Sequence, residues 1–337
     1  MMRSFLRALL SAAPLALICV ASSGAMAQNA GEIVVYNAQH ESLAKAWAEA
    51  FTAETGVKIV MRNGGDTQLG NQLVQEGAAS SADVFLTENS PAMVLVDSAK
   101  LFAPVDPATL DLVPDDYRPS HGRWVGIAAR ATIFAYDKRK LDQQKLPASI
   151  MDLASPAWKG RWAASPSGAD FQAIVSAILD VKGAAATQAW LNAMKQNALA
   201  LRGNAAALKA VNAGEVDGAV IYHYYWFGDQ AKTGENSQNV GIHYFRNRDP
   251  GAFISVSGGG VLASSKNKPQ AQAFVKWIVT KGQNILRTGN SYEYAVAKGA
   301  ASNERLTPLV DLQAPKIDPA GLNSRAVSDM MTAAGLL

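Results

Sequence analysis

The chain has 337 residues, of which 49% are apolar and 18% are charged, and its formal net charge is +3. These values exclude a disordered polar chain, a coiled coil and a strongly basic nucleic-acid-binding protein. The length is sufficient for two domains of ordinary size, each with its own hydrophobic core. We therefore expect a folded protein whose charge does not steer it toward polyanions.

The first 27 residues have the features of a secretory signal peptide. Arg3 and Arg7 precede an apolar run over residues 8–20, and Ala25-Met26-Ala27 supplies the small residues that signal peptidase recognises. The apolar run is shorter than the roughly 20 residues that a membrane-spanning helix needs. We predict that the segment is cleaved before Gln28 and that the protein is exported from the cytoplasm.

Cys19 is the only cysteine in the sequence, and it lies inside the predicted signal peptide. Ile18 before it is a poor match for a lipoprotein anchor, which needs a small residue at that position. The exported chain is therefore expected to have no disulfide, no thiolate metal site and no cysteine nucleophile. Its stability must come from packing.

The first part of the exported chain alternates strand and helix signals. β-rich apolar runs predict strands, and apolar residues at helical spacing that end near glycines predict helices. Asp66 is expected to cap one of these helices. A β-α-β-α-β-α order favours an open, largely parallel sheet. The predicted strands are 33–36, 57–61 and 82–86, and the predicted helices are 43–56, 66–77 and 91–99.

The middle of the chain repeats this plan and predicts a second lobe of the same kind. The signals are again short apolar strands followed by helices that start after turn residues. Two doubly wound α/β lobes follow from the two series. The predicted strands are 161–164, 198–201 and 218–222, and the predicted helices are 171–179 and 204–214.

Two apolar stretches, residues 125–136 and 252–257, are expected to cross between the lobes. A chain that leaves the first lobe, builds the second and returns has two such connections, and they can act as a hinge. The helix predicted over 269–279 then belongs to the first lobe. We place the N-terminal lobe at 28–129 and 254–301 and the C-terminal lobe at 130–253 and 302–337.

Ligands of open α/β sheets bind beyond the carboxyl ends of the strands. The residues at those positions in this chain carry oxygen and nitrogen donors. Each of them alone also has a structural explanation as a helix cap, a surface acid or core packing. Their common place at the same edge is what indicates a binding cleft. The residues are His40, Glu88, Ser167, Gly168, Ala169, Asn204, Tyr222, Tyr224 and Tyr225.

Tyr224 and Tyr225 indicate the chemistry of this cleft. An isolated tyrosine has a pKa near 10, so keeping one ionised at pH 7 costs about 4 kcal/mol. A hard trivalent cation compensates this cost, because its charge lowers the pKa of the groups that it binds and it prefers oxygen donors. Two phenolates and Glu88 supply three negative charges, and neutral His40 adds a nitrogen. The set fits Fe(III), with about two coordination positions left.

A small oxyanion could fill the remaining positions of such an ion. The turn 165–169 precedes a predicted helix, and the free N–H groups of a helix N-terminus bind anions. We expect the anion to be held in that turn, with further donors nearby. The expected contacts are Ser167, Gly168, Ala169, Asn204 and Arg130.

Several segments resemble the bacterial periplasmic ferric-ion-binding proteins, in order and over nearly all of the exported chain. The resemblance implies a two-lobed periplasmic solute-binding fold of type II, with mixed sheets joined by two hinge strands. It also implies a monomer that closes on Fe(III) and delivers it to an ABC transporter in the inner membrane. The segments are IVVYNAQHE (33–41), ADVFLTE (82–88), SPSGA (165–169), GNAAALKAVNAGEVDGAVIYHYYW (203–226), DPGAF (249–253) and residues 257–278.

Matched residue by residue, the resemblance assigns both a metal site and an anion site. Phosphate-using members of the family carry Asn at the position of Tyr222, and usually Asn again at His223. Tyr222 removes an amide donor, so carbonate or citrate, with Arg130, is as consistent with the sequence as phosphate. Tyr222 is an additional candidate that can also face the core. The implied iron ligands are His40, Glu88, Tyr224 and Tyr225, and the implied anion contacts are Ser167, Gly168, Ala169 and Asn204.

Two other functions remain open at this stage. Related lobed proteins bind polyamines, thiamine or oxyanions, and the aromatic run 222–226 could surround an organic cation. An enzyme is the third possibility, for example a hydrolase that uses His40 and Glu88 on a bound metal. Against it, the sequence contains no nucleophile elbow, HExxH helix, P-loop or dinucleotide fingerprint. His121 and His243 are interpreted as structural.

Overall fold

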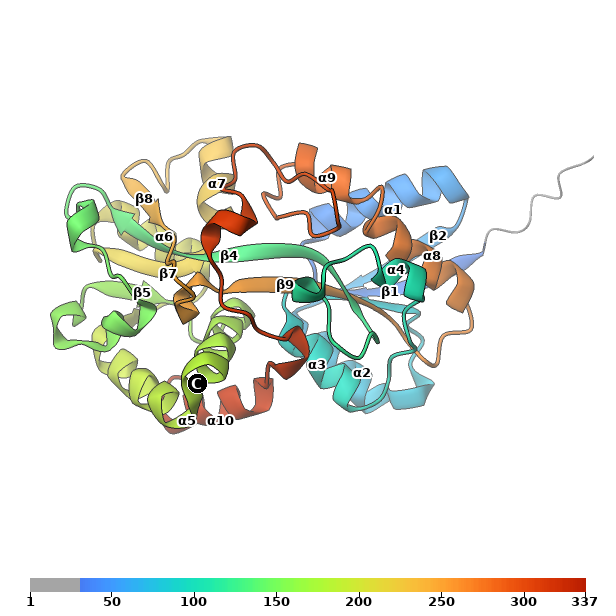
Figure 1. Cartoon of the computed structure of the whole chain (residues 1–337), viewed down its shortest axis with the longest axis horizontal. Helices are drawn as coiled ribbons and strands as arrows, with labels where there is room; N and C mark the ends of the chain where they lie inside the picture. The colour runs from blue at the N-terminus through green and yellow to red at the C-terminus, as the bar shows by residue number, and fades with distance from the viewer. Residues whose placement is uncertain (1–30) are drawn as a thin grey trace, which may run out of the picture.

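The computed structural model describes residues 31–337, so the predicted signal peptide lies outside the described residues. Two α/β halves lie side by side along the long axis, and the strands β4 (Val125–Asp137) and β9 (Ile254–Val261) run between them (Figure 1). The strand order is β2-β1-β3-β9-β4-β7-β5-β6, and β8 pairs with β4. The central place of β4 and β9 in this order makes them the connection between the halves.

In the first half, helices cover both faces of a mixed sheet. α1 forms because Leu43, Trp47 and Phe51 recur at helical spacing and are buried, and it ends at Gly56 in the left-handed conformation. α1, α8 and α9 lie on one face, and α2 and α3 on the other (Figure 1). The elements are β1 (Glu32–Asn37), α1 (Glu41–Thr55), β2 (Lys58–Asn63), α2 (Asp66–Glu76), β3 (Val84–Leu86), α3 (Ser90–Ser98), α4 (Pro107–Leu110), α8 (Lys268–Ile278) and α9 (Gln283–Thr288).

The second half repeats this layering around a smaller sheet. β7 pairs antiparallel with β4 and parallel with β5, and β5 pairs parallel with β6. The C-terminal helix α10 packs on α5 and also contacts α3 of the first half. The elements are β5 (Trp162–Ala164), α5 (Ala169–Asn197), β6 (Ala198–Ala200), α6 (Asn204–Ala213), β7 (Gly218–Tyr222), α7 (His223–Lys232), β8 (Val240–His243) and α10 (Ser324–Ala333).

β4 belongs to both halves. Its residues 125–131 pair with β9, which is also bonded to β3, whereas its residues 132–136 pair with β7. The change of partner falls between Ala131 and Thr132. The sequence-based prediction of a crossing strand over 125–136 is therefore confirmed, while the residue boundaries of the two lobes stay a prediction.

Most of the predicted helices and strands are confirmed, and two local predictions are wrong. Asp66 does not cap α2, because Gly65 holds that position and the Asp66 carboxylate accepts N–H groups of the loop after β3 instead. The helix predicted over 171–179 continues to Asn197, across a kink at Gly183, whose φ of 77° interrupts it.

The predicted strand 252–257 is displaced, and β9 includes three consecutive glycines. A Cβ atom at Gly258 would lie 2.3 Å from Met93 Cγ, and one at Gly260 would lie 2.7 Å from the Phe102 ring. Helix α3 and the neighbouring loop thus pack directly on the β9 backbone, where only glycine fits.

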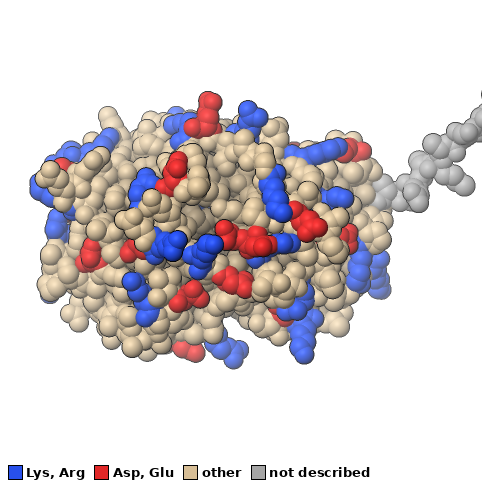
Figure 2. Space-filling model, viewed as in Figure 1, with Lys and Arg blue, Asp and Glu red and all other residues tan. Residues whose placement is uncertain are grey.

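Charges of both signs are mixed on the face shown in Figure 2, which agrees with the small net charge. Among residues 31–337, none of the helices combines the length and the apolar character that crossing a membrane requires.

We predict that Gly218→Ala destabilises the second half. A methyl group on Gly218 would lie 2.1 Å from Phe134 Cζ, and the buried Phe134 ring packs edge-on against Trp158. The expected loss in the free energy of unfolding is about 1–3 kcal/mol, measured by urea denaturation. Gly228→Ala is the control, because its Cβ meets nothing within 4 Å in the described part of the chain and it lies within α7. Equal stability of the two variants would contradict this packing.

Candidate metal centre

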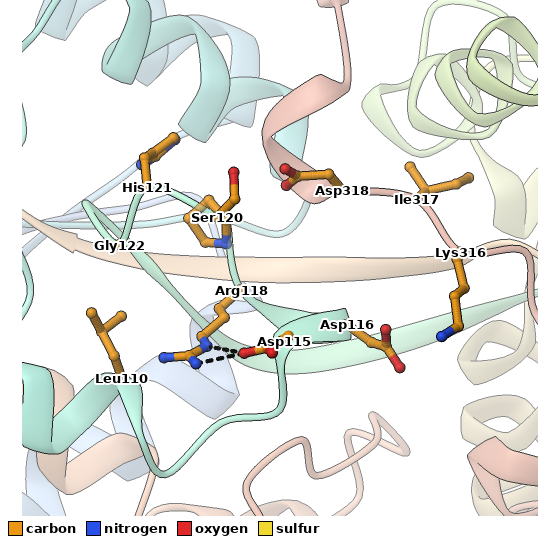
Figure 3. Close-up of a pocket in the computed structure, with 11 residues that line it drawn as sticks. Leu110, Asp115, Asp116, Arg118, Ser120, His121, Gly122, Lys316, Ile317 and Asp318 are labelled. Carbon is orange, nitrogen blue, oxygen red and sulfur yellow. Dashed lines mark hydrogen bonds and ion pairs between the residues drawn. The ribbon is translucent and has the colours of Figure 1, made fainter.

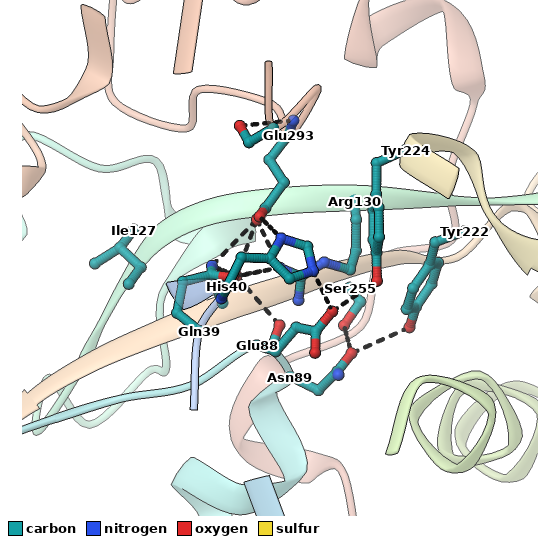
Figure 4. Close-up of polar contacts among 12 residues, drawn as sticks. Gln39, His40, Glu88, Asn89, Ile127, Arg130, Tyr222, Tyr224, Ser255 and Glu293 are labelled. Atoms are coloured by element: carbon teal, nitrogen blue, oxygen red, sulfur yellow. Dashed lines mark hydrogen bonds and ion pairs between the residues drawn. The ribbon is translucent and has the colours of Figure 1, made fainter. Parts of the chain in front are cut away.

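Four residues expected as metal ligands lie together where the two halves meet, and Figure 4 shows three of them, His40, Glu88 and Tyr224. His40 follows β1 and Glu88 follows β3, whereas Tyr224 and Tyr225 lie in the first turn of α7. His40 Nε2 lies 3.0 Å from Glu88 Oε1, and the Tyr224 hydroxyl donates to the same oxygen at 2.6 Å. The ring centroids of Tyr224 and Tyr225 are 4.4 Å apart. Each half therefore supplies two of the four donors.

The sheet and one buried acid position the first pair of donors. β1 and β3 are parallel neighbours, so the loops after their carboxyl ends meet. Asp66 accepts the backbone N–H groups of Glu88 and Asn89, both at 2.9 Å. Burial and the nearby charge of Glu88 raise the pKa of Asp66 to about 8, and the backbone N–H of Glu88 and the side-chain amide of Asn89 offset part of this effect. Asp66 thus fixes the loop that presents Glu88.

A carboxylate that sequence reasoning missed joins the two tyrosines. Asp170 Oδ2 accepts a hydrogen bond from the Tyr225 hydroxyl at 3.3 Å and lies 3.1 Å from the Tyr224 hydroxyl, which donates its proton to Glu88. The same oxygen accepts from Asn204 Nδ2 at 2.7 Å, and Oδ1 accepts from Asn89 Nδ2 at 2.9 Å. Asn89 belongs to the first half, so Asp170 is bonded from both halves.

Asp170 lies among the residues expected to bind an anion. Gly168 is the N-cap of α5, Ala169 is its first residue, and Asp170 is in the first turn. Ser167 is exposed, and Asn204 is buried with its amide bonded to Asp170. A negative side chain at a helix N-terminus interacts favourably with the helix dipole. The sequence feature that could have indicated Asp170 is its position directly after the turn 165–169, which was expected to bind an anion.

The other two candidates, Arg130 and Tyr222, are fully buried. Arg130 Nη2 donates to Glu293 Oε2 at 2.6 Å, and within residues 31–337 its Nε and Nη1 atoms have no hydrogen-bond partner. The Tyr222 hydroxyl lies 3.3 Å from Asn89 Oδ1. Tyr222 is therefore part of the interior beside the site. No sequence pattern indicated Glu293, since it follows no predicted strand.

The charges of the site depend on these contacts. Burial lowers the pKa of His40, but Glu293 and Glu88 outweigh this effect and raise it to about 10. Burial raises the pKa of Glu88, but bonds to His40 and charges nearby bring it down to about 2. Burial and the neighbouring carboxylates raise the pKa of both Tyr224 and Tyr225. Without a metal, the site therefore holds an imidazolium and two neutral phenols.

A cavity of about 510 Å³ leads from the surface to this group of donors. Residues after β1, from α6, from α7 and from the segment before Glu293 form its wall. This opening gives a small solute a route to the donors. The lining is His40, Ser42, Ala205, Ala206, Leu208, Lys209, Tyr224, Tyr225, Gly228, Asp229, Lys232, Asn236, Asn290 and Ser291.

A separate cavity of about 610 Å³ lies between residues 110–122 and 316–318 (Figure 3). Acidic and basic side chains are mixed in its lining, and Arg118 pairs with Asp115. The cavity therefore does not favour a ligand of one charge. His121 at its wall lies 3.1 Å from an Asp97 oxygen, and His243 Nε2 contacts a backbone carbonyl at 3.1 Å. Both contacts fit the structural interpretation of these histidines.

Comparisons with known proteins agree with this architecture. Residues 79–316 match the model of the bacterial extracellular solute-binding proteins. The chain is 66% identical over 316 residues to the Fe(3+)-binding periplasmic protein of Serratia marcescens, covering 93% of this chain and 94% of that protein. The structure is similar to that of iron-bound HitA from Pseudomonas aeruginosa, with a TM-score of 0.85, 39% identity and coverage of 90% and 99%. It is also similar to Trichodesmium FutA in complex with iron and citrate, with a TM-score of 0.80, 26% identity and coverage of 91% and 100%.

Two α/β halves joined by crossing strands, with donors from both at their meeting edge, have the architecture of two-lobed solute-binding proteins of type II, and the matching family and relatives are binding proteins rather than enzymes. The chain belongs to the family of bacterial extracellular solute-binding proteins. The fold class and the family resemblance expected from the sequence are thereby confirmed.

The raised pKa of His40 predicts how the stability of the metal-free protein depends on pH. The folded protein keeps an imidazole proton up to a pKa of about 10, whereas the unfolded chain loses it near 6.5. The stabilisation that this proton gives to the folded protein is complete below pH 6.5 and is lost as the pH rises through 10. We expect urea denaturation to show a decrease in stability over this range that is smaller in His40→Gln. Parallel curves for the two proteins would contradict the assignment.

Proposed function

We propose that this protein captures Fe(III) in the periplasm through His40, Glu88, Tyr224 and Tyr225. The observation that carries the proposal is that the Tyr224 hydroxyl and His40 Nε2 both contact Glu88 Oε1, so donors from the two halves already surround one point. A metal at that point would bridge the halves and favour the closed arrangement. The names of the Serratia and Pseudomonas relatives support iron as the solute.

The protonation of the site supports a trivalent cation in particular. The pKa of each tyrosine is raised by burial, so deprotonation costs more here than in water. Only a strongly polarising, oxygen-preferring ion offsets that cost for Tyr224 and Tyr225 together. Two phenolates and Glu88 then balance the charge of Fe(III), with His40 bound as neutral imidazole.

Asp170 is our proposed source of a further oxygen donor. Its Oδ2 atom is within 3.3 Å of both phenol oxygens, so a metal that replaces the phenol protons lies next to it. Burial raises the pKa of Asp170 to about 6, and a bound cation would favour its ionised form. This carboxylate would take the place of an anion from solution. The citrate in the Trichodesmium complex supports the alternative, in which a synergistic anion such as phosphate, carbonate or citrate binds at Ser167, Gly168, Ala169, Asn204 and Arg130.

The packing of the aromatic residues does not favour an organic cation. Tyr224 and Tyr225 pack against each other at 4.4 Å, and the Tyr222 ring is fully buried. An aromatic cage needs ring faces that are open to the ligand.

The proposed role extends to transport. After export by its signal peptide, the protein would act in the periplasm as a monomer. It would deliver iron to the permease of an ABC transporter in the inner membrane. Membership of a solute-binding family supports this role.

The first test is the absorption spectrum of purified protein titrated with ferric nitrilotriacetate. We expect a phenolate-to-iron charge-transfer band in the visible range. Tyr224→Phe and Tyr225→Phe should each weaken the band and reduce affinity by at least about tenfold, or about 1.4 kcal/mol. Tyr136→Phe, in β4 away from the site, is the control. Full colour and affinity in both site variants would reject the ligand set.

A second test separates the carboxylate of Asp170 from an external anion. We expect Asp170→Asn to lose at least about tenfold in iron affinity in buffer without phosphate, carbonate or citrate, with partial recovery when one of them is added. The wild type should need no added anion. Asp180→Asn, an exposed position on the same helix, should change nothing. A wild type that binds iron only with an added anion would favour the synergistic-anion alternative.

A further inference from the structure

Glu293 is a fully buried carboxylate whose two oxygens bind different partners. Its Oε1 atom lies 2.9 Å from His40 Nδ1, and its Oε2 atom accepts from Arg130 Nη2 at 2.6 Å. Figure 4 shows the His40 ring between Glu293 on one side and Glu88 on the other. The imidazole is therefore held at both of its nitrogen atoms.

The backbone around Glu293 is fixed to the crossing strand. Tyr294 pairs with Ala129 of β4 through hydrogen bonds of 2.8 and 3.0 Å in both directions. Gln39 Nε2 donates to Glu293 Oε2 at 3.2 Å, and Ser257 Oγ is 3.5 Å from it. A carboxylate held by its own backbone and by three side chains has little freedom to follow the imidazole, so the imidazole must follow the carboxylate.

From this geometry we infer that Glu293 is a positioning residue for His40, an inference that rests on the proposed iron site. The two nitrogens of an imidazole point to opposite sides of the ring. The 2.9 Å contact between His40 Nδ1 and Glu293 Oε1 favours a proton on Nδ1, and the lone pair of Nε2 then faces Glu88 and Tyr224. This contact thereby favours the tautomer and the ring orientation that offer Nε2 to a metal, as carboxylates do for metal-binding histidines in general.

Glu293 itself does not become a ligand in this arrangement, because a metal on Nε2 lies on the far side of the ring from Oε1. Its charge is compensated by Arg130, which is equally buried. Removing one partner of a buried ion pair leaves the other charge uncompensated. Because Arg130 neutralises it, the Glu293 carboxylate can contact His40 without adding to the negative charge that the iron must balance.

The test compares iron affinity in Glu293→Gln and Arg130→Gln with that of the wild type. Both variants break the same ion pair, but only Glu293→Gln removes the carboxylate that holds Nδ1. We expect Glu293→Gln to lose about 10- to 100-fold in affinity and Arg130→Gln clearly less. Glu293→Asp keeps the charge for Arg130 with a shorter side chain, so it should fold and still lose affinity. Equal losses in the Gln variants would indicate a structural role and overturn the inference.

A double-mutant cycle shows whether Glu293 acts through His40. In a His40→Gln background, Glu293→Gln should cost less than about threefold in affinity, because the imidazole that it orients is absent. A full loss in that background would overturn the inference. The charge-transfer band of the wild type is the separate readout of the proposed function, since the band comes from the tyrosines. If the wild type shows no band, the proposed function and the inference both fail.

Nitrogen NMR of His40 gives a readout that does not depend on affinity. With Ga(III) as a diamagnetic substitute for Fe(III), the wild type should show a protonated Nδ1 and a metal-bound Nε2. In Glu293→Gln, we expect a mixture of ring states or a loss of the Nδ1–H signal. The wild-type pattern in Glu293→Gln would contradict the positioning role.

Discussion

The structure depends on one electrostatic condition: acidic groups from two halves meet in a buried place, and something positive must lie between them. In the metal-free state, the protons of the two tyrosines and of the His40 imidazolium supply this positive charge. Tyr224 donates its proton to Glu88, Tyr225 donates its proton to Asp170, and the His40 imidazolium lies between two carboxylates. The same arrangement of side chains would therefore serve both states: it would surround a trivalent cation, and without the cation the protonated groups bond to one another.

This condition explains why polar residues around the site form a continuous network. Asn89 donates to Asp66 and Asp170, which lie in different halves, and accepts from Ser255 of β9. A buried polar group without a partner costs about 1–3 kcal/mol, which favours an acceptor for each interior donor, although Nε and Nη1 of Arg130 have none among the described residues. The buried pair of Arg130 and Glu293 belongs to the same network. Such pairs contribute little to stability, and their value here is the geometry that they fix.

The sequence predicted the parts of the site that follow strands. His40, Glu88 and the two tyrosines lie directly after β1, β3 and β7, where strand order alone brings them to an edge. Asp170 was missed because an acid in the first turn of a helix has an ordinary local explanation. Glu293 was missed because its position comes from pairing of Tyr294 with Ala129, a contact between residues far apart in the chain that no local pattern contains. Asp66 was misread for the same reason, since its partners are 22 and 23 residues away.

The place where β4 changes partner divides the donors of the site into two groups with separate attachments. Glu293 is tied to β4 at Ala129, on the side that pairs with β9, and it holds His40. On the other side, β7 pairs with β4 from Thr132, and α7 with its tyrosines follows β7 directly. A rotation of the backbone between these two points would carry the imidazole away from the phenols without breaking either attachment. We therefore expect the residues around Ala131, with Ile254 of β9 beside them, to be the part of the fold where a small change in backbone angles opens or closes the site.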